Sequence, residues 1–257
     1  MTKINIQTIV ENLIDTFLHA GKVSLELRNR GLTKEIKSDN TPVSNGDIEV
    51  NKIITKKINE LTPHIPIVSE ETSDNKSIKN LNDFWLIDPI DGTFDYLNNR
   101  DEFTLNAALI IDKKPAIGII NAPGKNRIFY SYGYGDSYEK IDRKEVNLKS
   151  IKKENLSEIV AVSYSDKLKP QILEIHKKFN VNRFQKMKSS YKFCVIAAAE
   201  YDLYVAEPRA HEWDIAAGHA ILEHAGGTVC DFNNKEILYG KKDFKNPSLI
   251  VKRSKDL

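Results

Sequence analysis

Apolar residues recur with helical spacing over the first sixty positions of the chain. Residues 9–18 carry an apolar side chain every three to four positions, interrupted by Glu11 and Asp15, which predicts an amphipathic helix packed on the core. A second helix is predicted over about residues 45–61, with several isoleucines on its inner side. Between the two helices, residues 37–44 are rich in turn-forming side chains, and Pro42 prevents a continuous helix.

Short apolar runs follow in quick succession, at residues 65–68, 84–87, 105–111, 116–120 and 128–130. Their length and their β-branched residues predict strands. Since so few residues separate them, we expect an antiparallel or mixed sheet in this half.

After a polar stretch at residues 139–155, strands and helices alternate. Strands are predicted at 159–162, 203–205 and 228–230, and helices at 168–179, 190–200 and 213–224. This alternation predicts a layered α/β second half. We therefore expect an α/β protein with an α+β half over residues 1–150 and an α/β half over 151–257, which meet at a cleft.

The composition limits the classes of function. The 257 residues include 38 Lys and Arg and 36 Asp and Glu, a net charge of +2, which argues against a nucleic-acid polymer or a membrane surface as partner. No apolar stretch approaches a transmembrane span or a signal peptide. Cys194 and Cys230 lie in apolar segments, where buried thiols in a reducing compartment are the simplest interpretation. We expect a cytoplasmic monomer or homodimer.

The most informative segment runs from Phe84 to Thr93. A buried apolar strand leads to Asp88, Pro89 is expected to end its hydrogen-bond ladder, and Asp91 follows in a turn that Gly92 makes tight. Two fixed carboxylates this close require a cation, and the carbonyl of Ile90 is a further oxygen ligand for Mg²⁺. The alternative is a turn capped by two aspartates.

Two further strand or helix ends carry acids. Glu70 and Glu71 follow an apolar strand, and Asp214 begins a helix. A carboxylate in the first turn of a helix also serves as a cap, and we expect such a structural role for Glu71. The sequence does not show whether these acids converge.

Here the chain resembles a known family. The motifs Asp88-Pro-Ile-Asp-Gly-Thr93 and Trp213-Asp-Ile-Ala-Ala-Gly218 are similar to the paired signature of the inositol monophosphatase superfamily of Mg²⁺-dependent, lithium-sensitive phosphatases. Residues 69–71 and 43–47 resemble its two upstream acidic motifs. The resemblance covers residues 37–248 and implies a layered αβαβα sandwich.

The resemblance also implies roles for the acids. Two Mg²⁺ would be held by Glu70, Asp88, Asp91, Asp214 and the Ile90 carbonyl, with Asp47 near a third, weaker metal. Thr93 would orient the attacking water, with Asp47 or Glu70 as proton acceptor. A phosphomonoester dianion repels carboxylates, so metal ions must stand between them.

Within the superfamily, residues 95–96, 100–106 and 189–194 resemble 3'(2'),5'-bisphosphate nucleotidases of the CysQ type. This resemblance implies hydrolysis of the 3'-phosphate of adenosine 3',5'-bisphosphate, giving AMP and phosphate. The substrate contacts implied by the superfamily as a whole are Gly92, Thr93, Ser189, Ser190, Lys192, Glu207 and Arg209, and the CysQ resemblance places Lys192 at the second phosphate or the nucleotide.

Departures from the pattern keep alternatives open. Lys188 stands where the CysQ motif has Gly, and Pro208-Arg209 has a shifted spacing. Glu207 stands six residues before Trp213, where inositol monophosphatases have a Glu that contacts inositol hydroxyls. The alternatives are therefore an inositol-1-monophosphatase or a broader sugar phosphatase and, from another class, a non-catalytic nucleotide-binding regulator.

Overall fold

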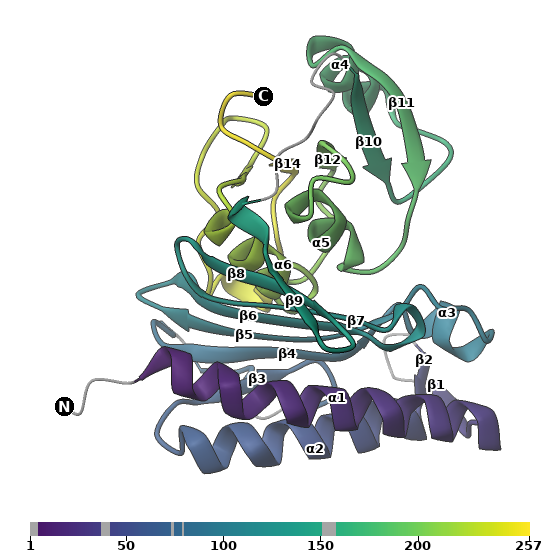
Figure 1. Cartoon of the computed structure of the whole chain (residues 1–257), viewed down its shortest axis with the longest axis vertical. Helices are drawn as coiled ribbons and strands as arrows, with labels where there is room; N and C mark the ends of the chain where they lie inside the picture. The colour runs from purple at the N-terminus through teal and green to yellow at the C-terminus, as the bar shows by residue number, and fades with distance from the viewer. Residues whose placement is uncertain (1–4, 37–41, 73–74, 79, 151–157) are drawn as a thin grey trace.

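The computed structural model describes residues 5–36, 42–72, 75–78, 80–150 and 158–257. Most of the turn-rich stretch predicted at 37–44, and the boundary expected between residues 150 and 151, lie outside these ranges. Figure 1 shows five layers: a helix pair, a large sheet, a second helix layer, a smaller sheet, and an outer helix. The predicted αβαβα sandwich is confirmed.

The first layer consists of α1 (Ile6–Arg30) and α2 (Asn45–Leu61), which lie across one face of the large sheet (Figure 1). Their apolar stripes pack on the sheet around Phe17, Ile54 and Trp85. The bounds of α2 are those predicted, because Ser44 and Asp47 form a capping box at its start. A small hairpin of β1 (Lys34–Ile36) and β2 (Pro42–Ser44) precedes it.

The large sheet has the strand order β3-β4-β5-β6-β7-β8-β9. Its strands are β3 (Ile67–Ser69), β4 (Phe84–Asp91), β5 (Thr104–Ile111), β6 (Lys114–Ala122), β7 (Arg127–Gly133), β8 (Asp136–Ile141) and β9 (Lys144–Asn147). β3 is parallel to β4 and the other neighbours are antiparallel, so the predicted mixed sheet is confirmed. The sequence did not predict β8 and β9, because these strands near the edge are mostly polar.

The expectation that Pro89 ends its strand is wrong. β4 continues to Asp91, with Asp88 paired to Asn106 and Asp91 paired to Thr104. Two residues of β4 therefore stand opposite one residue of β5, which is a β-bulge, a position where proline is tolerated. In a regular strand, residues three apart point to opposite faces; the extra residue turns Asp88 and Asp91 to the same face.

The smaller sheet has the order β11-β10-β12-β14-β13. Its strands are β10 (Ile159–Ser163), β11 (Val181–Lys186), β12 (Leu203–Ala206), β13 (Thr228–Cys230) and β14 (Leu249–Lys252). β10 is parallel to both β11 and β12, and β14 is antiparallel to its neighbours. The sequence missed β11, an exposed edge strand, and β14.

Helices complete the second half. α5 (Tyr191–Ala197) and α6 (Glu212–His224) lie between the sheets, and α4 (Pro170–Lys178) covers the outer face of the smaller sheet (Figure 1). The core between the sheets forms around Phe129, Phe193 and Trp213. A short helix, α3 (Thr93–Leu97), and three 3-10 turns, Pro123–Lys125, Leu148–Ser150 and Lys242–Phe244, complete the described elements.

Both cysteines are free thiols. Cys194 is buried as expected, whereas Cys230 is half-buried, because side chains alternate along β13 and Val229 is the one turned into the core. Among the described helices, none combines the length and the apolar character that crossing a bilayer requires.

Candidate metal centre and substrate cleft

Three acids from distant parts of the chain meet at one point. Glu70 follows β3, Asp88 lies at the bulge of β4, and Asp214 lies in the first turn of α6. One carboxylate oxygen from each lies within 4.8 Å of the other two. The structure thus brings together three of the acids that the sequence singled out.

Local hydrogen bonds fix two members of this cluster. Asp214 accepts a hydrogen bond of 2.8 Å from the backbone N–H of His211, the residue that caps α6. Near Glu70, the Nζ of Lys76 donates to the Glu70 carbonyl at 2.8 Å and lies 5.1 Å from the ring centre of Trp213. Lys76 therefore joins the end of β3 to the start of α6.

The cluster has the electrostatics of a cation site. Removal from bulk water raises the pKa values of the Asp88 and Asp214 carboxyls, and the neighbouring carboxylates raise them further. Oδ1 of Asp88 is buried and has no hydrogen-bond partner among the described residues. An all-oxygen donor set with an orphaned, buried oxygen fits a hard divalent cation such as Mg²⁺.

Asp91 lies beside the cluster and faces the second half of the chain. Its carboxylate accepts a hydrogen bond from the backbone N–H of Ser190. Burial raises the pKa of Asp91, and the positive charge of Lys192 opposes that shift. The Ser190 hydroxyl donates to Asn106 at 2.8 Å, so both the backbone N–H and the hydroxyl proton of Ser190 already have acceptors.

Asp47 and Thr93 lie next to each other, at the starts of α2 and α3. The Thr93 hydroxyl lies 3.0 Å from the carbonyl oxygen of Ile90 and 3.4 Å from Oδ1 of Asp47. Asp47 is buried, which raises its pKa to about 6, although hydrogen bonds from Ser44 oppose the shift. The Thr93 hydroxyl therefore lies within hydrogen-bond reach of a buried carboxylate.

Gly92 makes this arrangement possible. Its φ of +92° lies in the left-handed region, and a Cβ there would come within 2.7 Å of the backbone oxygen of Glu102. No residue with a side chain fits this turn without a shift of the backbone.

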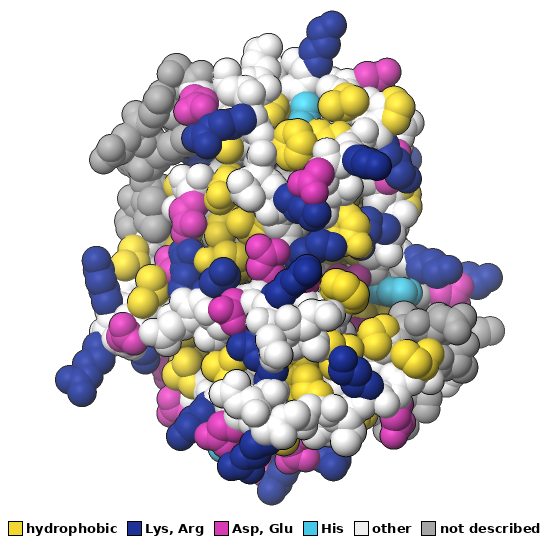
Figure 2. Space-filling model, turned by 90° about the vertical axis from the view of Figure 1, so that its right-hand side faces the viewer, with side chains coloured by type: hydrophobic (Ala, Val, Ile, Leu, Met, Phe, Trp, Pro, Cys, Tyr) yellow, Lys and Arg dark blue, Asp and Glu magenta, His cyan; other side chains and the backbone are white. Residues whose placement is uncertain are grey.

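A cleft of about 240 Å³ opens from the acids toward the second half. Three cations line it, Lys188, Lys192 and Arg209, which we call the cation wall. Burial lowers the pKa of Lys192 to about 8, while Asp91 acts in the opposite direction. Figure 2, a view from the right-hand side of Figure 1, shows Lys and Arg side chains gathered between the upper and lower parts of the molecule.

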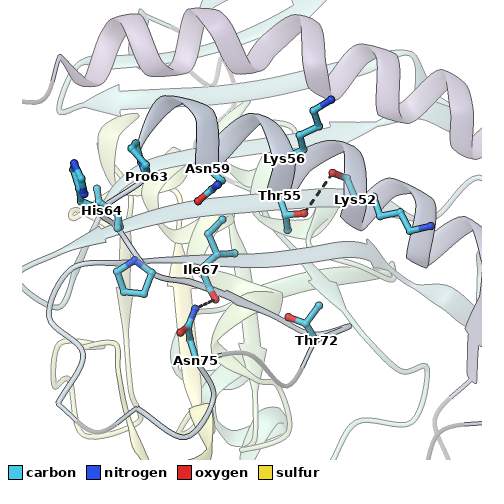
Figure 3. A pocket seen from close by; sticks show the side chains of 11 residues that line it. Lys52, Thr55, Lys56, Asn59, Pro63, His64, Ile67, Thr72 and Asn75 are labelled. Atoms are coloured by element: carbon cyan, nitrogen blue, oxygen red, sulfur yellow. Dashed lines mark hydrogen bonds between the residues drawn. The ribbon is translucent and has the colours of Figure 1, made fainter.

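Glu207 does not share this cleft. It lines a neighbouring pocket of about 310 Å³, where Lys169 forms an ion pair with it. Ser189 and Arg209 do line the cleft. A larger hollow, about 750 Å³, lies between α2 and β3 (Figure 3). Its described lining includes Lys52, Lys56 and His64 but no member of the acidic cluster or the cation wall.

Sequence reasoning missed two tyrosines of the cleft. Tyr164 follows β10 and Tyr204 lies on β12, and both line the cleft and the neighbouring pocket. These strands are parallel, and ligands bind at the carboxyl ends of parallel strands. That rule, applied to the predicted strands at 159–162 and 203–205, could have found them.

Comparison with known proteins shows which family the chain belongs to. The family model described as the inositol monophosphatase family matches residues 5–257. The chain therefore belongs to the inositol monophosphatase family, and it is a metal-dependent phosphomonoesterase by class.

Within that family, the chain is similar to proteins named as CysQ nucleotidases. The chain is 34% identical over 256 residues to a 3'(2'),5'-bisphosphate nucleotidase CysQ of Buchnera aphidicola, with 93% of each chain covered. It is 31% identical over 219 residues to the protein of that name from Escherichia coli, with 84% of this chain and 87% of the relative covered. The crystal structure of CysQ from Bacteroides thetaiotaomicron superposes with a TM-score of 0.77 at 27% identity, covering 97% of this chain and 98% of that one.

Proposed function

We propose that the protein hydrolyses the 3'-phosphate of adenosine 3',5'-bisphosphate, releasing AMP and phosphate. The observation that carries this proposal is the pairing of opposite charges in one cleft. Asp91 and Asp214 line this cleft together with the cation wall, and Asp214 also belongs to the acidic cluster with Glu70 and Asp88. A substrate with one phosphate to cleave and a second to bind complements both.

Mg²⁺ would be held by Glu70, Asp88, Asp91, Asp214 and the Ile90 carbonyl, with Asp47 near a weaker site. When bound, Mg²⁺ supplies the positive charge that activates water for attack on phosphorus and stabilises the leaving oxygen. The orphaned oxygen of Asp88 and the raised pKa values of the cluster support this assignment.

The chain's own residues would position and deprotonate the nucleophile. The Thr93 hydroxyl would take the proton of the attacking water as it passes its own proton to the Asp47 carboxylate, so that Thr93 stays neutral. Burial raises the pKa of Asp47 to about 6, which is closer to neutral pH than an ordinary carboxylate and suits a proton acceptor.

The second phosphate would bind the cation wall. Lys192 is nearly fully buried and its Nζ contacts the Ser189 carbonyl, so the ammonium is held in place before substrate arrives. The exposed guanidinium of Arg209 can approach a phosphate with two parallel N–H groups. The backbone around Gly92 and Ser189 would complete the substrate contacts.

The names of the relatives support the nucleotide over inositol phosphate. Two relatives that align over most of this chain are both called bisphosphate nucleotidases. The residue that favours inositol, Glu207, is turned to Lys169 in the neighbouring pocket. We therefore propose no second function.

Steady-state phosphate release tests the proposal. With saturating Mg²⁺, we expect kcat/KM for adenosine 3',5'-bisphosphate to exceed that for inositol 1-phosphate by about 100-fold or more, since a charged second phosphate contributes several kcal/mol. EDTA should abolish both rates. A preference for the inositol ester would overturn the assignment.

A further inference from the structure

Tyr164 is an exposed aromatic residue that two cations contact. It directly follows β10, and its side chain is 38% exposed. The guanidinium carbon of Arg209 lies 3.4 Å from its ring centre, and Nζ of Lys188 lies 4.2 Å from it. A single ring therefore holds the side chains of two separate loops.

The same pattern continues deeper in the cleft at Tyr204. Nζ of Lys192 lies 5.2 Å from the Tyr204 ring centre, and the Tyr204 hydroxyl oxygen accepts a hydrogen bond from the Arg209 guanidinium. Arg209 is thus held between the face of Tyr164 and the hydroxyl of Tyr204.

These aromatic contacts offset the electrostatic repulsion among the three cations of the cation wall. Three like charges gathered in about 240 Å³ repel one another, and Lys188 and Arg209 both disfavour the charged form of Lys192. The negative face of an aromatic ring attracts each cation without neutralising it. A carboxylate in that position would hold the cations equally well, but it would repel a phosphate.

We propose that Tyr164 is a positioning residue that holds Lys188 and Arg209 toward the cleft and thereby sets the preference for substrates with a second phosphate. The inference rests on the proposed function, and it gives Lys188 a role in place of the glycine that related motifs carry. Tyr164 is the suitable residue to change because it is exposed, whereas Tyr204 is buried against Phe193.

The test compares two substrates that share a base and a 3'-phosphate. Adenosine 3',5'-bisphosphate carries the second phosphate and adenosine 3'-monophosphate lacks it. For Tyr164→Leu, we expect the ratio of kcat/KM between the two to fall by about 5- to 30-fold, mainly through KM for the bisphosphate. Tyr164→Phe retains the ring and should keep the wild-type ratio.

Phe184→Leu is the matched control. Phe184 is also 38% exposed in the second half but does not line the cleft, so this variant should also keep the wild-type ratio. Thermal melting of all three variants checks that they fold.

Two outcomes would overturn the role of Tyr164. One is an unchanged ratio in Tyr164→Leu. The other is an equal loss on both substrates, which is the result expected if Tyr164 only stacked on the base. If the wild-type protein itself does not distinguish the two substrates, the proposed function fails, and the inference fails with it.

Discussion

The carboxylate of Asp91 accepts a hydrogen bond from the backbone N–H of Ser190, a residue 99 positions further along the chain. This contact joins the bulge of β4 to the start of α5. The Ser190 hydroxyl donates to Asn106 on β5, so the Thr104 hydroxyl, 2.8 Å away, must be its donor. The candidate metal centre therefore lies where the first and second halves of the chain contact each other.

Replacing Asp91 with asparagine tests the role of its negative charge while the shape of the side chain is kept. Asp91→Asn keeps an oxygen that can accept from Ser190 but loses the negative charge that a metal requires. We expect kcat to fall by at least about 100-fold, equivalent to about 2.7 kcal/mol, with the fold kept, because the side-chain volume is unchanged. Activity within about tenfold of wild type at saturating Mg²⁺ would contradict the assignment of Asp91 as a ligand.

The Thr93 hydroxyl is expected to be essential for the chemical step. Thr93→Val keeps the shape of the side chain and removes the hydroxyl that faces Asp47, so kcat should fall by about 100- to 10,000-fold. Thr93→Ser keeps the hydroxyl and should retain most of the activity. Equal rates for the valine and serine variants would show that the hydroxyl plays no part.

Gly92 should tolerate no side chain. Gly92→Ala combines a left-handed backbone with a Cβ 2.7 Å from the Glu102 oxygen, so we expect unfolding to require about 2 to 4 kcal/mol less free energy. Gly226 is the matched control, since its φ is +101° and nothing lies within 4 Å of its added Cβ.

Chemical denaturation of the two alanine variants measures the difference. Gly226→Ala should lose only about 1 to 2 kcal/mol, the cost of the backbone conformation. If both variants lose the same amount, contact with Glu102 is not what restricts position 92.

Without metal, the protein should lose stability as pH rises toward neutrality. The folded-state pKa of Asp47 is raised from 3.8 to about 6, and those of Asp88 and Asp214 are also raised. The folded state therefore binds more protons than the unfolded state above about pH 4, and its stability falls as pH rises through the raised values. Lys192, with a pKa lowered to about 8, acts oppositely only above that pH.

Mg²⁺ should reverse this trend because it displaces the protons. Melting temperatures at about pH 5 and about pH 7.5, each with EDTA and with Mg²⁺, test it. We expect the larger Mg²⁺ stabilisation at the higher pH. A stabilisation independent of pH would mean that the titrating acids do not bind the metal.

The sequence predicted the helices and inner strands well because their apolar patterns are strong. The helix predicted over about residues 45–61 is α2, Asn45–Leu61, and Ser44 caps its start. β8 and β9 were missed because their polar side chains lack an alternating apolar pattern. Pro89 was misjudged because a bulge depends on the neighbouring strand, which a local pattern does not contain.

For the site, too, the sequence predicted the residues that have a local signal and missed those whose role depends on contacts between distant segments. Glu70, Asp88 and Asp214 were found from their positions at the ends of elements, although only the fold shows that they meet. Tyr164 and Tyr204 were missed because their importance comes from the cations that they hold. Glu207 stood at a promising spacing, but its side chain turns to Lys169.

Phosphorus NMR of the products tests the central claim most directly, because it shows which phosphate is cleaved. If the acidic cluster takes the 3'-phosphate and the cation wall holds the 5'-phosphate, adenosine 3',5'-bisphosphate must give inorganic phosphate and adenosine 5'-monophosphate. We predict that the 3'-phosphate signal disappears while the 5'-phosphate signal remains. Accumulation of adenosine 3'-monophosphate, or no turnover with Mg²⁺ present, would contradict the account.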